Sequence, residues 1–370
     1  MGRARMDVIV VGAGVVGLGI AWRAAQRGLA VRLVDPAPGS GATWTAAGML
    51  APATELHYGE EPLLRLGLES ARCYPSFVAE LESATGRRVG YRRDGTVVVA
   101  WDAADLAGLR DLSAFGQSLG LATELVTGRE LRRLEPALAS GLPGGLVAGD
   151  DCQVDNRLLQ EALLAAAELA GARIRRERAV SVSGHEVVLA GGDVLTADAV
   201  VLAAGAWSAL LSVAVPVRPV KGQTLRLRMP GEVPLRHVVR GSIKGSPVYV
   251  LPRTDGHVVI GASSEEAGFD LRPRAGAIYE MLRDAQALVP VLGEAVFDEV
   301  STSVRPGSPD NAPLIGSTGV DGLIVATGHY RNGILLAPVT ADGVAELLAS
   351  GTLPRLLAPF TPSRFEGAHA

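Results

Sequence analysis

The first residues of the chain alternate between apolar runs and one helical segment. Met6–Val11 is a short apolar run, which predicts a parallel strand buried on both faces. Val15–Arg27 has helical character and is followed by Gly28, a typical helix stop. Ala30–Asp35 predicts a second strand. This order predicts a β–α–β unit at the start of a parallel sheet.

The rest of the chain mixes helical and β-type segments. The further helices that we expect are Glu60–Thr85, which Pro75 could break, Asp102–Leu119, Thr127–Leu134, Asp155–Ala170 with Asp155 as its N-cap, and Ile334–Ser350. The expected strands are Val89–Trp101, as a hairpin or a strand with a turn at Asp94 and Gly95, then Ile174–Val182, His185–Leu189, Ala199–Ala203, Leu225–Met229, Val248–Leu251, His257–Ala262 and Leu323–Ala326.

Parallel-sheet material thus occupies the beginning, middle and end of the chain, and a more antiparallel block interrupts it twice. This pattern predicts an α/β protein with two domains. A discontinuous Rossmann-like domain would be formed by residues 1–86, 146–217 and 300–370. A β-rich domain, an antiparallel sheet with helices, would be formed by residues 87–145 and 218–299.

A dinucleotide fingerprint joins the first strand to the first helix. Val8–Gly17 contains the pattern G-x-G-x-x-G. Gly12 permits the tight turn, Gly14 lets the backbone approach a pyrophosphate, and Gly17 lets the helix pack closely on the strand. Asp35 ends the second strand, where a carboxylate can meet a ribose hydroxyl. The alternatives are a glycine-rich turn without a ligand, and an Asp35 that only caps a turn.

Two later segments favour FAD over NAD as the dinucleotide. Thr196–Gly205 is a strand that ends at a turn of small residues, as in flavoproteins that close the nucleotide site in this way. Gly322–Gly333 is another strand that leads toward a helix, whose N-terminus can support negative charge on a reduced flavin. The chain of an NAD enzyme does not need to return to its first domain in this way.

Composition narrows the classes of function. The net charge of −4 over 370 residues does not suggest a nucleic-acid binder, which usually carries a basic face. Ala199–Val217 is uncharged and long enough to span a membrane, but it begins as a β-branched strand and contains small residues and a proline, so we expect no membrane segment. Met1–Met6 leave no room for a signal peptide before the first strand. Cys73 and Cys152 have no metal or disulfide spacing, so a reducing cytoplasm is the expected location.

Four segments carry a resemblance to a known family. They are Val10–Gly17, Thr43–Pro52 (T-W-T-A-A-G-M-L-A-P), Ser303–Gly316 (S-V-R-P-G-S-P-D-N-A-P-L-I-G) and Gly328–Pro338 (G-H-Y-R-N-G-I-L-L-A-P). The chain resembles the D-amino acid oxidase family of flavoproteins and, within it, the glycine oxidases of thiamine-thiazole biosynthesis. The similarity in order and spacing covers nearly the whole chain.

This resemblance implies the residues of an FAD site. Beside the three glycines of the fingerprint, it implies contacts with FAD from Val15, Val16, Asp35, Ala42, Thr43, Ala47, Gly48, Met49 and Val180, and it implies that His329, Tyr330, Arg331, Asn332, Gly333, Ile334 and Leu335 wrap the isoalloxazine. FAD is expected to be non-covalent, because no cysteine follows Cys152 to attach it.

The resemblance also implies three substrate contacts. Arg305, which lies between Val304 and Pro306 in an expected loop, would bind the substrate carboxylate, or alternatively pair with Asp310. Tyr249 would reach the same carboxylate, or be a half-buried core residue. Arg331 would contact substrate or flavin, or cap the loop before the last helix.

Two further expectations concern the chemistry. His329 is expected to form part of the cofactor wall, and no acid–base residue is required, because an amine that binds neutral needs no strong protein base. The segment Ala262–Ser264 ends its strand in small residues where the family pattern has a bulkier one. The substrate pocket is therefore expected to be roomier.

The implied reaction is oxidation of glycine or another small amino acid by molecular oxygen, through an imine to glyoxylate, ammonia and hydrogen peroxide. Implied partners are these small molecules, further copies of the chain as a dimer or tetramer, and a thiazole synthase. The open alternatives are an oxidase or dehydrogenase for D-amino acids or sarcosine, a tRNA-modifying flavoprotein, which the acidic balance disfavours, and a flavin-binding protein without turnover.

Overall fold

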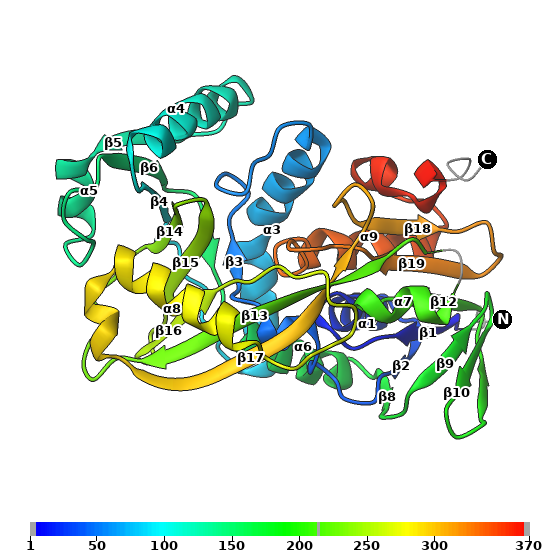
Figure 1. Ribbon diagram of the computed structural model, residues 1–370. Helices are drawn as coiled ribbons and strands as arrows, with labels where there is room; N and C mark the ends of the chain where they lie inside the picture. The colour runs from blue at the N-terminus through cyan, green and yellow to red at the C-terminus, as the bar shows by residue number, and fades with distance from the viewer. Residues whose placement is uncertain (1–4, 213–214, 366–370) are drawn as a thin grey trace.

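The protein is described here by a computed structural model that covers residues 5–212 and 215–365 (Figure 1). The first β–α–β unit is as the apolar pattern predicts, and it consists of β1 (Asp7–Val11), α1 (Val15–Gln26) and β2 (Ala30–Val34). These strands belong to a six-stranded sheet whose order is β18 (Leu314–Ser317), β19 (Leu323–Thr327), β12 (Ala199–Leu202), β1, β2 and β8 (Arg173–Arg175). All neighbours in it are parallel except β18 and β19.

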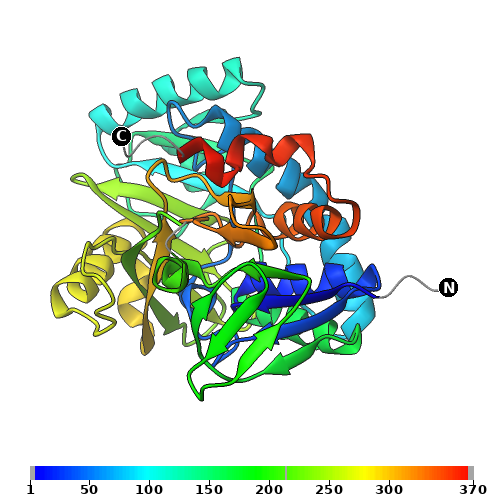
Figure 2. The same ribbon diagram turned by 90° about the vertical axis from the view of Figure 1, so that its right-hand side faces the viewer.

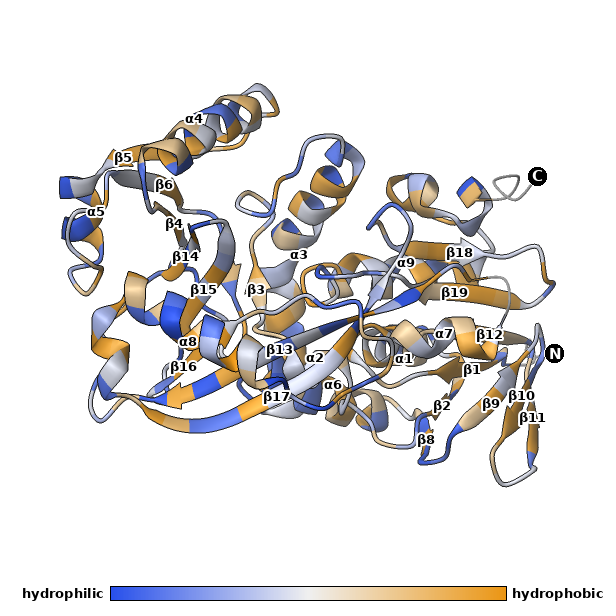
Figure 3. Ribbon diagram, in the orientation of Figure 1, coloured by the Kyte–Doolittle hydropathy of each residue, from blue (hydrophilic) through white to orange (hydrophobic). Residues whose placement is uncertain are grey.

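Different layers cover the two faces of this sheet. On one face α1 packs with α3 (Glu61–Thr85), α6 (Asn156–Leu169) and α9 (Ala337–Ser350) around an apolar core. On the other face lies a small antiparallel sheet of β9 (Ala179–Val182), β10 (Glu186–Leu189) and β11 (Val194–Thr196), as Figure 2 shows. The central strands β1, β12 and β19 are apolar except at Asp7 and Thr327, at strand ends, because both faces of the sheet are covered (Figure 3).

The predicted helices are present, mostly with bounds that differ by one residue at an end. Asp155 caps α6, since its side chain accepts hydrogen bonds from the backbone N–H groups of Arg157 (2.9 Å) and Leu158 (3.1 Å). α3 continues through Pro75, which is exposed, because Tyr74 and Phe77 anchor the helix in the core on both sides of it. The last helix begins at Ala337 and not at Ile334, because the residues before it form consecutive turns.

The second large element is an eight-stranded sheet that is antiparallel except for one pair of neighbours. Its order is β17 (Val296–Gly307), β13 (Arg218–Arg228), β16 (His257–Gly261), β15 (Ser246–Pro252), β14 (Val238–Ile243), β4 (Thr96–Ala100), β6 (Gly144–Ala148) and β5 (Glu124–Thr127). α8 (Ala275–Leu288) packs on one face of it. The opposite face contacts the segment around Ala47, through Leu251 and Val259.

β17 differs from what the sequence predicts. The expected proline-punctuated loop around Arg305 is part of this 12-residue strand, in which Arg305 pairs with Val220 of β13. The predicted domain boundary at residue 300 therefore falls inside β17. Figure 1 shows β13 and β17 running side by side toward the six-stranded sheet, so the two strands connect the two halves of the molecule.

Smaller elements complete the fold. They are α2 (Ala42–Thr45), α4 (Ala103–Ser118), α5 (Gly128–Leu134), α7 (Ser208–Leu211), and the two short paired strands β3 (Met49–Leu50) and β7 (Cys152–Gln153). Of the predicted Val89–Trp101 segment only β4 is a strand, and Arg92 forms an isolated bridge with Gln153. Across the described part of the chain, every helix is too short or too polar to cross a membrane.

Candidate active site

A cavity of about 1300 Å³ lies between the two large sheets. Its wall includes the carboxyl ends of the parallel strands, at Val11, Asp35, Ala203 and Thr327. Ligands of open α/β sheets bind at this edge. The volume is larger than the roughly 300–1000 Å³ of pockets that enclose one small ligand, so a dinucleotide and a substrate fit together.

The fingerprint glycines form one end of the cavity. Gly12 has a φ of +106°, and a Cβ there would meet the backbone of Ala203. A Cβ on Gly17 would meet the carbonyl of Gly12, so this glycine serves packing and does not line the cavity. A Cβ on Gly14 would lie 3.3 Å from the Thr43 hydroxyl, within the cavity wall.

The start of α1 is suited to phosphate. Its first turn contains no acidic residue, and Val15 and Val16 line the cavity. The Val15 N–H donates to the Thr43 hydroxyl (3.0 Å), which places this segment against α2. The free N–H groups and the positive end of the helix dipole attract an anion here. The residues present therefore fit the pyrophosphate of FAD.

Asp35 combines the two roles that the sequence left open. Its carboxylate accepts hydrogen bonds from the backbone N–H groups of Ala13 (2.8 Å) and Ala37 (2.8 Å), so it caps the glycine turn. It also lines the cavity. Each carboxylate oxygen has a second acceptor position, so a contact with a ribose hydroxyl stays a prediction.

Most of the other predicted FAD residues surround the same cavity. Those that line it are Ala42, Thr43, Ala47, Gly48, Met49, Val180, His329, Tyr330, Arg331, Gly333 and Ile334. Asn332 and Leu335 do not, and they line a smaller depression beside α3. Because the chain forms successive turns between Tyr330 and Leu336, not all side chains of this segment face the same side.

His329 and Arg331 are only two positions apart in the sequence but differ in environment. His329 is buried, and its Nε2 lies 3.1 Å from the Thr340 hydroxyl. Burial lowers the pKa of His329 to about 3, so the ring is neutral at physiological pH. Arg331 is exposed, lies against the ring of Tyr330 and is 3.3 Å from Nε2 of His57. The structure thus places a neutral imidazole in the wall and a cation at the rim.

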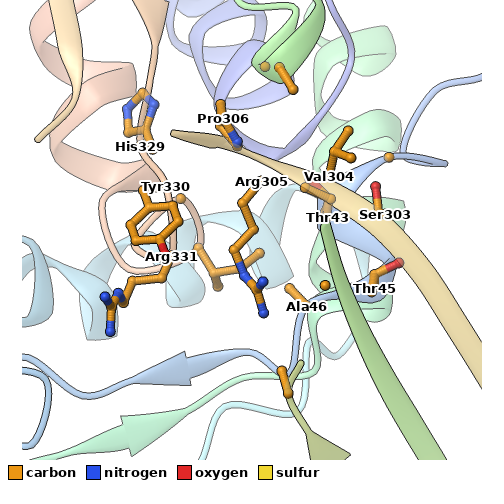
Figure 4. A pocket seen from close by; sticks show the side chains of 18 of the residues that line it. Thr43, Thr45, Ala46, Ser303, Val304, Arg305, Pro306, His329, Tyr330 and Arg331 are labelled. Carbon is orange, nitrogen blue, oxygen red and sulfur yellow. The ribbon is translucent and has the colours of Figure 1, made fainter. Parts of the chain in front are cut away.

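The other end of the cavity is a face of the eight-stranded sheet. Two glycines lie on the neighbouring strands β13 and β16 of this floor: Gly222, which lines the cavity, and Gly261. A Cβ on Gly222 would collide with the Arg305 guanidinium, and a Cβ on Gly261 would collide with the Tyr249 ring. Arg305 and Tyr249 therefore lie across the floor from opposite sides, and Figure 4 shows Arg305 extended into the pocket beside Tyr330.

Arg305 has no carboxylate partner among the residues that the structure describes. Its Nη1 donates to the carbonyls of Ser263 (3.0 Å) and, more weakly, Lys221 (3.5 Å). Asp310 pairs with Arg364 instead (2.8 Å), so the alternative pairing with Arg305 is not made. A half-buried guanidinium held by two carbonyls, with its other N–H groups free in the described region, is suited to an incoming carboxylate.

Tyr249 has a polar neighbour that sequence reasoning missed. Burial raises the pKa of Tyr249 to about 12, and the nearby Arg305 partly offsets this rise, so the hydroxyl is neutral and can donate. Arg240 is directly opposite Tyr249 in the β14–β15 ladder, so both side chains lie on the cavity face. Arg240 pairs with Glu55 (3.3 Å). The segment V-V-R-G-S-I, which forms β14, does not alternate between apolar and polar residues, so no local pattern marked Arg240 as a strand residue.

The small residues Ala262, Ser263 and Ser264 line the cavity near Arg305. Neither Cys73 nor Cys152 is among the lining residues of the described chain. Groups of three or more metal-ligating side chains are also absent from the described residues. The cavity thus offers a dinucleotide cradle at one end and a cationic, hydrogen-bonding floor at the other.

These features define a class of protein, a flavin-dependent oxidoreductase with a two-part cavity. The comparison with family models agrees, since the model for "FAD dependent oxidoreductase" matches residues 7–347. The chain belongs to this family of FAD-dependent oxidoreductases, the D-amino acid oxidase family.

Individual relatives narrow the comparison. Glycine oxidase from Geobacillus kaustophilus is 35% identical over 375 residues, which cover 98% of each chain. Its crystal structure matches with a TM-score of 0.91 at 34% identity, over 97% of this chain and 99% of that one. The crystal structure of iminodiacetate oxidase from Chelativorans matches with a TM-score of 0.87 at 27% identity, over 96% of this chain and 98% of that one.

A second kind of relative is longer. The bifunctional protein ThiO/ThiG of Trichormus variabilis is 34% identical over 368 residues, which cover 97% of this chain but only 55% of that protein. The chain thus spans about half the length of the relatives of this kind.

Proposed function

We propose that this protein oxidises glycine, or another small α-amino acid, with molecular oxygen. Glycine, oxygen and water would give glyoxylate, ammonia and hydrogen peroxide, with an imine as the first organic product. Glycine oxidases among the relatives support this substrate, since the similarity extends over the whole of both chains.

One observation carries the proposal, namely Arg305 without an acidic partner in the described part of the chain, at the cavity floor. A cation in such a position favours a substrate that carries an anion, and the planar guanidinium fits a carboxylate. The neutral Tyr249 hydroxyl can donate to the same group. Amino acids, and not simple amines, are therefore the expected substrates.

Bound FAD supplies the electron acceptor for this reaction. The residues of the chain bind and orient the amino acid so that its Cα faces the flavin end of the cavity, and the walls exclude water. Burial lowers the pKa of His329 to about 3, which makes the ring a weak base, and its Nε2 lies against the Thr340 hydroxyl (3.1 Å). An amine that binds in its neutral form requires no base. Correct orientation alone lowers the activation free energy of such a step by several kcal/mol, on the order of 7–11 at most.

The second candidate is an oxidase for N-substituted or larger amino acids, such as sarcosine or D-alanine. Ala262, Ser263 and Ser264 favour it, because short side chains leave room beside the Arg305 guanidinium. A relative that is by name an iminodiacetate oxidase points the same way.

An anaerobic screen tests both candidates. The FAD-loaded protein is mixed with glycine, sarcosine, D-alanine or ethylamine, which lacks the carboxylate, and the loss of flavin absorbance is followed. Glycine is expected to reduce the flavin fastest and ethylamine slowest, and oxygen should then yield one peroxide per amine. Reduction by ethylamine as fast as by glycine would contradict the role of the carboxylate.

The product and the setting are part of the same proposal. We propose that the reaction supplies thiamine-thiazole biosynthesis in the cytoplasm, with a thiazole synthase as partner. The half-length match to the bifunctional ThiO/ThiG proteins supports this partner. Co-purification of the two proteins, with transfer of the imine before it hydrolyses, would test it.

A further inference from the structure

Asp151 is a buried carboxylate behind the cavity wall. Asp151 lies in the turn between β6 and β7, and only 1% of the residue is exposed. One oxygen accepts a hydrogen bond from the backbone N–H of Ala53 (3.2 Å), and the other accepts from the Thr54 hydroxyl (2.6 Å). Asp151 itself does not line the cavity, but it is hydrogen-bonded to Thr54, which does.

The connection continues through Thr54 to the substrate end. The Thr54 oxygen accepts a hydrogen bond from Nη1 of Arg240 (3.2 Å), which also pairs with Glu55. Thr54, Glu55 and Arg240 all line the cavity. Arg240 lies beside Tyr249 on the same face of the sheet. A continuous series of contacts thus leads from Asp151 to the neighbour of Tyr249.

We propose that Asp151 is a positioning residue for substrate binding, which holds Thr54 and, through its hydroxyl, Arg240 in place beside Tyr249. This inference rests on the proposed function, because Tyr249 is taken to meet the substrate carboxylate. Nothing in the overall reaction uses Asp151 directly. Its effect is on how tightly the substrate binds, and not on the transfer of electrons.

The ionised form of Asp151 suits these two hydrogen bonds best, because both of its oxygens are then acceptors only. Both of its oxygens accept, from Ala53 and from Thr54, and an amide in its place offers a single acceptor. Thr54 can pass the effect on because its one hydroxyl donates to Asp151 and accepts from Arg240.

The ionisation of Asp151 lies in an accessible range of pH. Burial raises its pKa to about 6, opposed by the bonds from Thr54 and Ala53. The charged groups that face it are Arg240, which favours the carboxylate, and Glu55, which disfavours it. Because the folded-state pKa is raised, any stability from this group is present at low pH and is lost as the pH rises through about 6. The charge at neutral pH therefore opposes folding.

Asp151→Asn and Thr54→Val test the proposal in the FAD-loaded enzyme. We expect either change to raise KM for glycine about five- to tenfold at pH 8, with kcat within about twofold. The dissociation constant of glycolate, an amine-free carboxylate, should rise in parallel when followed by flavin absorbance. The Tm of Asp151→Asn at pH 8 should equal or exceed that of the parent, which a merely structural role would not give.

The pH profile supplies a second readout. The ratio of parent to Asp151→Asn kcat/KM should fall toward one below pH 6, because the parent is then protonated at Asp151 and resembles the amide. Ionisation of the substrate amine cancels in this ratio. Thr54→Ser, which keeps the hydroxyl, should recover most of the loss, and Asp284→Asn is a matched control at another buried carboxylate, remote on α8.

The outcomes separate the two proposals. If the parent oxidises glycine and Asp151→Asn has the parent's KM and glycolate affinity at pH 8, the positioning role is overturned. If the parent does not oxidise glycine, the proposed function fails, and glycolate binding by Thr54→Val against Thr54→Ser still decides the inference. If Asp151→Asn does not fold, the same Thr54 pair decides it.

Discussion

The two ends of the cavity are built in different ways. At the nucleotide end the contacts come from the backbone of Gly12–Val16 and from Asp35, which are close together in the sequence. At the substrate end they come from residues of four strands, β13, β14, β15 and β17, which are far apart in the sequence. The first end depends on the absence of side chains at a few glycines. The second depends on the register between strands that are distant in the chain.

Two arginines show the same contrast within one half of the molecule. Arg253 is buried and donates to the carbonyls of Ala47 and Val154, so its hydrogen bonds are used for structure. Arg305 is half-buried and keeps part of its guanidinium free in the described region. Burial alone does not identify a functional cation, whereas unused donors in a cavity do.

The largest expected effect is at the nucleotide end. Gly14→Val should abolish FAD binding, because the added methyl groups fill the space beside Thr43 that the pyrophosphate needs. The flavin content of the purified protein measures this. Gly276→Val, at a position in α8 where a Cβ meets nothing, should keep its flavin. A folded Gly14→Val protein with normal flavin content would contradict the binding of the FAD pyrophosphate at this turn.

The next effect is at the substrate end. Arg305→Leu should leave FAD bound but lower kcat/KM for glycine on the order of 10²-fold, because charge-assisted hydrogen bonds contribute roughly 1.5–3 kcal/mol each. Arg305→Lys should recover only part, since a point charge does not reproduce the planar fork. Ethylamine should lose its disadvantage in Arg305→Leu. Unchanged steady-state kinetics with glycine would make Arg305 structural.

A smaller effect would show that the floor matters as well as the charge. Gly222→Ala should displace the Arg305 guanidinium and raise KM about tenfold, or about 1.4 kcal/mol, with little change in flavin content. Gly276→Ala is the matched control, because its new methyl group lies in open space. Equal KM values for the two alanine variants would count against a flat floor that positions Arg305.

The last prediction is that no flavin is covalently attached to the protein. Acid precipitation should release all the flavin, because neither Cys73 nor Cys152 lies among the lining residues of the described chain. Burial also raises the pKa of both thiols, so neither is a reactive thiolate. Absorbance of the supernatant and of the pellet measures the partition, and flavin retained in the pellet would reveal a covalent bond.

Local features could be predicted from the sequence. The β1–α1–β2 unit, the fingerprint turn and the Asp155 cap each depend on residues within a few positions of one another. The family follows from motifs of the same local kind. For such features the backbone conformation and the nearest side chains decide the outcome, and both are written in one short segment.

Tertiary structure alone decided the substrate end. The sequence placed Arg305 in a loop, but pairing with β13 makes it part of a strand and aims it across Gly222. Asn332 and Leu335 face away from the cavity because the chain turns between them and Tyr330. The contacts of Asp151 with Thr54, and of Thr54 with Arg240, join residues 97 and 186 positions apart. No local pattern records such distances, because strand register and burial are set by the competition of the whole chain for one core.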